Sequence, residues 1–185
     1  MLAILFSGVL YGQDFVTTGS YNLKVKDNDL KVSLFKESGV KNSNYFEPDY
    51  IIKKTIEMSG IYDKAFGIDS SVCTSNAINI YIVKHSTLNS KSMLDNWFYE
   101  DSPNRPQPGE YLLGLYNYED GVNKIYISDS RYELRSFDLR MAHEVSHLWY
   151  KKSCKKYSTT MSDEKMAVLF EKYVKLGVFK WIKVI

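Results

Sequence analysis

The chain has 185 residues, 44% hydrophobic and 25% charged, which is enough to bury a substantial core in one domain without covalent or metal support. The formal net charge of +2 gives no reason to expect nucleic acid or an anionic membrane as a partner. Beyond the N-terminal dozen residues, no apolar run approaches the length that spans a bilayer, so stable membrane insertion is not expected.

The first twelve residues, MLAILFSGVLYG, form a short apolar run typical of the hydrophobic part and cleavage zone of a secretory signal. A basic start is missing, because the first basic residue is Lys24. We expect residues 1–12 to be a truncated signal peptide, residues 13–185 to be a single domain, and the protein to be secreted or periplasmic. The alternative is a buried N-terminal strand or helix in a cytoplasmic protein. Export would permit a disulfide between Cys73 and Cys154, and two separate half-buried thiols are the equal alternative.

The first half of the domain alternates between strand and helix patterns. Apolar and polar residues alternate on both sides of Asp27-Asn28-Asp29, which predicts a hairpin over residues 21–36. Residues 47–62 begin with an acid and a proline and carry apolar residues at helical spacing, so they predict a helix with Gly60 near its end. The apolar run 78–83 predicts a central strand, and residues 91–98 predict a short helix.

The second half begins with three prolines in EDSPNRPQPGE, which predict a loop. A second hairpin from Tyr111 to Ser128 follows, turning at Glu119-Asp120-Gly121. Ser136 then suits the N-cap of a helix, and a last helix is expected from about Ser162 towards Tyr173. This order of elements predicts an α+β domain.

The helix after Ser136 contains MAHEVSHLWY, in which two of the three histidines stand four positions apart with a glutamate after the first. A random arrangement of this composition would produce H-E-x-x-H with a frequency of about two in a thousand, so the motif needs support from its surroundings. On a helical wheel, an apolar stripe falls on one side and His143 and His147 fall on the other. Two imidazoles one turn apart can reach a single metal ion, and Glu144 points to the same side without being needed as a ligand. The stripe consists of Phe137, Met141, Val145 and Leu148.

Catalytic zinc takes three protein ligands, so a third must come from elsewhere in the chain. His85 ends a predicted strand far upstream, and we expect it to be a surface histidine. Glu164 opens the last predicted helix, where Ala167 and Val168 one turn later are small enough for close packing on the motif helix. Glu171 lies two turns further on the same face and is the rival ligand, unless it forms a salt bridge with a lysine.

H-E-x-x-H followed on a second helix by E-x-x-A resembles the gluzincin branch of zinc metallopeptidases, which have a thermolysin-like architecture. The resemblance covers residues 111–175 and implies a small, single-domain, zincin-like member. Its fold would have a mixed or antiparallel sheet whose edge hairpin packs on the motif helix, followed by a helix that bears the glutamate ligand. The metzincin pattern does not fit, because Tyr150 and Ser153 stand where that family has glycine and histidine.

The resemblance implies a zinc-dependent peptidase that binds one Zn²⁺ per chain through His143, His147 and Glu164 and cleaves a peptide or protein substrate. Glu144 would be the general base that takes a proton from the metal-activated water. The edge strand would bind the substrate in extended form. The residues expected along it are Leu113, Gly114, Leu115 and Tyr116. Little chain follows the predicted glutamate ligand, so the family's transition-state stabiliser cannot be carried over to this sequence. Tyr150 is a candidate for that role, and its alternative role is simple packing.

Two other functions keep the same metal site. The domain could be a non-catalytic zincin-like domain that binds zinc for stability or uses its cleft for binding. It could also be a specialised protease that acts on one regulatory or target protein, for example as a toxin. The sequence predicts neither the cleavage specificity nor the oligomeric state.

Overall fold

The computed structural model describes most of the chain, in several segments. The described residues are 14–25, 28–66, 77–98, 102, 105–119, 121–130, 137–151 and 163–176. Five features expected from the sequence lie outside them: the signal segment 1–12, Cys73, Cys154, the N-cap Ser136 and the side chain of Tyr150.

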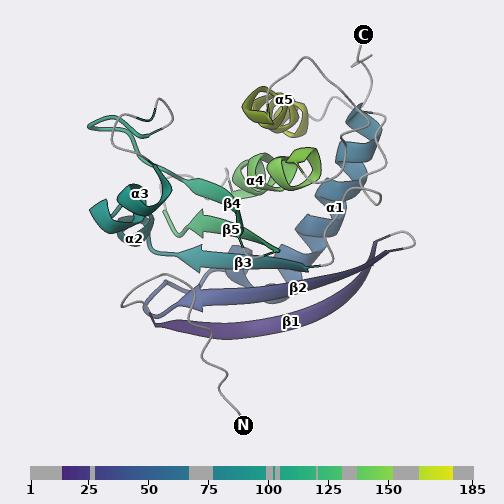
Figure 1. Ribbon diagram of the computed structural model, residues 1–185. Coiled ribbons are helices and arrows are strands. Elements are labelled where there is room, and N and C mark those ends of the chain that lie inside the picture. Colours follow the sequence, from purple (N-terminus) through teal and green to yellow (C-terminus); the bar gives the residue numbers. More distant parts are fainter. Residues whose placement is uncertain are drawn as a thin grey trace.

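The described strands form one five-stranded sheet in the order β1-β2-β3-β5-β4 (Figure 1). The outer pairs β1–β2 and β4–β5 are antiparallel hairpins, whereas β2–β3 and β3–β5 are parallel. Both predicted hairpins and the central strand are therefore confirmed, and the sheet is mixed. The strands are β1 (Phe15–Val25), β2 (Asn28–Glu37), β3 (Ala77–Val83), β4 (Gly114–Glu119) and β5 (Val122–Ser128).

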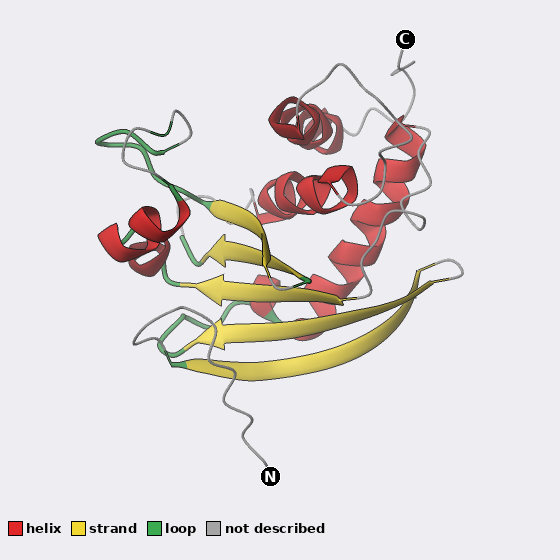
Figure 2. Cartoon of the chain, viewed as in Figure 1, coloured by secondary structure: helices red, strands yellow, loops and turns green. Residues whose placement is uncertain are grey.

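Two long helices lie against the sheet, a third packs on one of them on the side away from the strands, and two short helices lie beyond the end of β3 (Figure 2). The long helices are α1 (Pro48–Phe66), α4 (Phe137–Lys151) and α5 (Asp163–Leu176). The short ones are α2 (His85–Leu88) and α3 (Lys91–Trp97), and a single 3₁₀ turn, η1 (Asn44–Phe46), precedes α1. The arrangement confirms the expected α+β class. None of the described helices combines the length and the apolar character that crossing a membrane requires.

The core forms between the sheet and the long helices. The predicted apolar stripe of α4, from Phe137 to Leu148, is fully buried and joins a cluster with alternate residues of β2, β3 and β5. Burying such a stripe is what stabilises an amphipathic helix, and it turns the opposite side of α4 away from the core. The N-terminal end of α4 is tied to α1 by Asp138, which accepts a hydrogen bond of 2.7 Å from the Tyr50 hydroxyl and pairs with Lys54 at 2.9 Å.

Two details differ from the sequence expectations. The helix predicted to end near Gly60 continues to Phe66, because Tyr62, Ala65 and Phe66 pack into the core and outweigh the weak helix propensity of one glycine. His85 opens α2 and does not end a strand. The residue is half-buried, with Nδ1 3.2 Å from Ser128 Oγ, and it lies outside the His143–His147–Glu164 cluster.

Candidate metal centre

The side of α4 that faces away from the core carries both motif histidines. Their ring centroids are 5.0 Å apart, and the side chains of His143 and His147 are 20% and 13% exposed. The spacing of one helical turn therefore brings the two imidazoles together, as the sequence predicts, and both contact Glu164 of α5.

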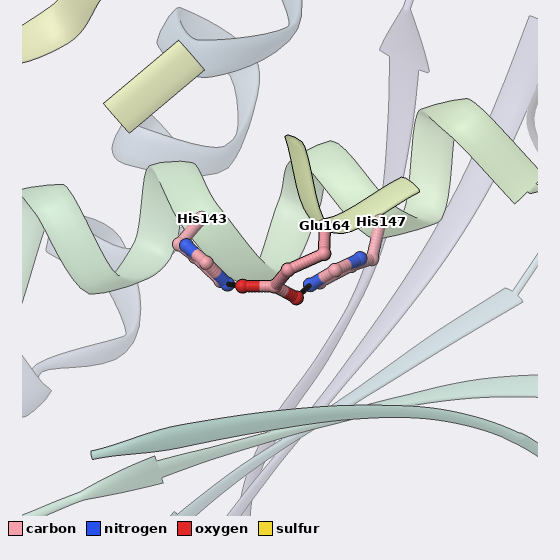
Figure 3. Close-up of side chains that lie close together, drawn as sticks. All are labelled: His143, His147 and Glu164. Atoms are coloured by element: carbon pink, nitrogen blue, oxygen red, sulfur yellow. Dashed lines mark ion pairs between the residues drawn. The ribbon is translucent and has the colours of Figure 1, made fainter. Parts of the chain in front are cut away.

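Glu164, in the first turn of α5, places its carboxylate between the two rings (Figure 3). Its Oε1 is 3.4 Å from His143 Nε2, and its Oε2 is 3.6 Å from His147 Nε2. A four-coordinate site with metal–ligand bonds of about 2.0–2.1 Å keeps neighbouring ligand atoms about 3.4 Å apart. In the metal-free centre the two histidines contact different oxygens of Glu164, and one ligand atom from each of the three residues lies within 4.8 Å of the others. Two imidazole nitrogens and one carboxylate oxygen are donor types that could hold a divalent first-row metal ion.

The other nitrogen of each ring faces a second carboxylate. Asp163 Oδ1 is 2.8 Å from His147 Nδ1, and Glu171 Oε2 is 3.4 Å from His143 Nδ1. A carboxylate at Nδ1 holds the proton there, which leaves the Nε2 lone pair for a metal and fixes the ring orientation. Of the two acids left open by the sequence, Glu164 is therefore the one that reaches both Nε2 atoms, and Glu171 has an orienting position.

Asp163 is a site residue that sequence reasoning missed. It directly precedes Glu164 and was visible as an acid in the first turn of a predicted helix. Its contact with His147 depends on how α5 crosses α4, which spacing along one chain segment does not determine.

Tyr116 packs against the metal centre from the sheet side. Its ring lies 5.9 Å from that of His147 at an interplanar angle of 22°, and only 9% of the residue is exposed. The hydroxyl donates to Asn123 Oδ1 at 2.9 Å, and Asn123 Nδ2 donates to the Ala77 carbonyl at 2.9 Å. Burial raises the pKa of Tyr116, so the phenol stays neutral. The Tyr116 side chain thus packs against the His147 ring. Because that side chain is buried, a substrate could contact Tyr116 only at its backbone groups.

Glu144 lies between α4 and the edge strand β4, and 6% of it is exposed. A Cβ atom added at Gly114 would lie 2.9 Å from both Cγ and Cδ of Glu144 and would overlap Oε1. The absence of a side chain at Gly114 is what allows the carboxylate to occupy this position. The pKa of Glu144 is raised to about 7, chiefly by burial, which the two histidines only partly counteract.

The charges of the centre favour a cation. Burial lowers the pKa of His143, but the hydrogen bond to Glu164 and the charges of nearby acids outweigh burial and raise it to about 9. The same bond lowers the pKa of Glu164. With no metal ion bound, His143 is therefore protonated at neutral pH.

The remaining predicted residues follow β4. Leu113 directly precedes the strand, with its carbonyl accepting from the Ser128 amide at 3.0 Å, and Leu115 is paired with Tyr126. Leu115, Gly114 and Tyr116 belong to β4, the strand next to α4. Comparison with known proteins gives no similarity: no protein-family model matches the chain, and no significant match was found among curated proteins or solved structures.

Proposed function

We propose that the protein is a zinc-dependent peptidase with a zincin-like fold, which hydrolyses peptide bonds with Glu144 as the general base. The observation that carries this proposal is the joint geometry of two groups. Both Nε2 atoms of the motif histidines face the Glu164 carboxylate, and Glu144 lies beside them over Gly114 of an edge strand. A metal-binding helix alone would not require a free carboxylate between the metal centre and a strand edge.

Each residue has a distinct role in this proposal. His143, His147 and Glu164 hold the metal, and Asp163 and Glu171 orient the rings. Zinc supplies a Lewis acid that lowers the pKa of water and polarises a carbonyl group. Glu144 accepts a proton from the attacking water and later passes it to the leaving amine.

The substrate in this proposal is an extended peptide added to the outer edge of β4. This strand ends the described sheet, and its first residue, Gly114, touches Glu144. An added strand would therefore lie beside the general base, held by main-chain hydrogen bonds.

A second candidate is a non-catalytic zinc domain. The ligands come from both α4 and α5, so a bound ion would join two helices and contribute to folding stability. Zinc analysis of the purified protein, combined with cleavage of unfolded casein and of a quenched peptide library, distinguishes the two. Stoichiometric zinc with cleavage that a chelator abolishes and zinc restores supports the peptidase. Stoichiometric zinc with no cleavage of either substrate supports the binding domain or a protease for a single target.

A further inference from the structure

The backbone groups of β4 alternate between the sheet and its outer edge. The Leu113 carbonyl accepts from the Ser128 amide, and the antiparallel register continues with Gly114 opposite Ile127. In an antiparallel pair, a residue that bonds to the neighbouring strand is followed by one whose N–H and C=O point the other way. The backbone groups of Leu112 and Gly114 therefore point towards the outer edge, where a substrate strand would bind.

At Leu112 those groups are already bonded to the side chain of Asn89. The Leu112 amide donates to Asn89 Oδ1 at 2.6 Å, and Asn89 Nδ2 donates to the Leu112 carbonyl at 3.0 Å. These two bonds reproduce the pair that a residue of an added strand would make with Leu112. The side-chain amide thus occupies the place of a substrate peptide unit.

Asn89 is held in this position by the short helix α2 that it ends. Its Nδ2 also donates to the His85 carbonyl at 2.9 Å. The start of α2 is fixed in turn, because the His85 amide donates to Asp129 at 2.8 Å and the Lys84 amide to the buried Glu37 at 2.9 Å. Displacing Asn89 from Leu112 would therefore require movement of α2 as well as rotation of the Asn89 side chain.

We propose that Asn89 closes the upstream end of the β4 edge and makes the enzyme cleave peptides close to their C-terminus. This inference rests on the proposed peptidase function. Antiparallel pairing is the more stable arrangement, so the substrate runs opposite to β4 and its C-terminal side points from Gly114 towards Leu112. The scissile bond lies at Glu144, hence beside Gly114. Leu112 is about 7 Å further along the edge, which leaves room for about two residues before the substrate meets Asn89.

The test is to map cleavage positions in a mixture of random-sequence synthetic peptides of about fourteen residues, by mass spectrometry, with the zinc-loaded full chain. Cleavage within about two residues of the C-terminus should exceed interior cleavage by about tenfold or more, which corresponds to about 1.4 kcal/mol. In Asn89→Ala the preference should fall to within about threefold, because the edge becomes open to longer substrates. Asn89→Asp keeps the acceptor for the Leu112 amide and should therefore retain part of the preference for cleavage near the C-terminus.

Ser90→Ala is the matched control. Ser90 Oγ accepts from the Met93 amide at the start of α3, next to Asn89 in sequence, and this variant should keep the wild-type cleavage positions. Hydrogen exchange gives a readout independent of activity: the Leu112 amide should be protected in the wild type and in Ser90→Ala, and should exchange at least about tenfold faster in Asn89→Ala.

The outcomes separate this inference from the function on which it rests. Wild-type cleavage spread evenly along the peptides would overturn the role of Asn89 and leave the peptidase intact. An Asn89→Ala variant that cleaves more slowly but at unchanged positions would reduce Asn89 to a structural residue and also overturn the inference. Absence of cleavage of any peptide by zinc-loaded wild type would overturn this inference together with a general peptidase function, and would favour the binding domain or a protease for a single target.

Discussion

Glu144 and Gly114 are in direct contact across the boundary between the motif helix and the edge strand, and no larger residue fits at position 114 without moving the carboxylate. Gly114→Ala should therefore displace Glu144 and lower the rate by about a hundredfold, as expected for misplacing a catalytic group by about 1 Å. Zinc content should be unchanged, because the three atoms nearest to the added methyl group all belong to Glu144, which is not among the proposed metal ligands. Gly60→Ala is the control, since its Cβ would meet nothing within 4 Å. Full activity in Gly114→Ala would contradict the assigned position of the base.

Glu144→Gln keeps the size of the side chain and removes its capacity to accept a proton. Cleavage should fall by about 10²–10⁴, with stoichiometric zinc and little change in melting temperature. Steady-state cleavage of a quenched peptide and zinc analysis of the same samples measure the two effects. A variant that cleaves as fast as the wild type would rule out Glu144 as the base.

Metal affinity should respond differently to the acids around the histidines. Glu164→Gln removes the group that faces both Nε2 atoms and should abolish stoichiometric zinc binding. Asp163→Asn and Glu171→Gln should weaken binding by about 10–100-fold and not abolish it, because these residues face the Nδ1 atoms. Competition against a chromogenic chelator measures all three. Loss of zinc in Glu171→Gln together with retention in Glu164→Gln would exchange the roles assigned to the two residues.

The contacts of Asp138 with Tyr50 and Lys54, which join α4 to α1, should make the free energy of unfolding fall at alkaline pH. Burial and the bond to Asp138 raise the pKa of Tyr50. For Lys54, burial lowers the pKa but the bonds to Asp138 and Glu57 outweigh it and raise the pKa. A group whose pKa is higher in the folded state stabilises the protein fully below its unfolded pKa, here about 10, and this contribution disappears as pH rises through the folded value.

Asp138→Asn should therefore lower the free energy of unfolding at neutral pH by about 1–2 kcal/mol and flatten its decline above about pH 10. Urea titrations between about pH 7 and pH 11 measure both effects. Asp49→Asn, an exposed acid in the first turn of α1, should change stability by no more than about 0.5 kcal/mol. If the free energy of unfolding falls equally with rising pH in wild type and in Asp138→Asn, the contacts of Asp138 with Tyr50 and Lys54 are not the cause of the fall.

Local patterns in the sequence determined most of the elements and part of the site. Alternation and turn residues predicted both hairpins, and helical spacing placed an apolar stripe opposite the two histidines of α4, as found. These features depend on residues within one or two turns of each other, where backbone geometry is nearly invariant, so the sequence alone was sufficient. The continuation of α1 beyond Gly60 was not predictable in this way, because it depends on what Tyr62 and Phe66 pack against.

Only the tertiary structure decided how residues from different elements meet. Glu164 and Glu171 share a face of α5, so spacing alone left Glu171 as a rival to the expected ligand Glu164. The crossing of α5 over α4 placed Glu164 at Nε2 and Glu171 at Nδ1 of His143. The same applies to the Asn89 amide on the β4 edge, which joins residues 23 positions apart. Such contacts depend on the relative position of packed elements, which the core determines collectively and no short stretch of sequence encodes.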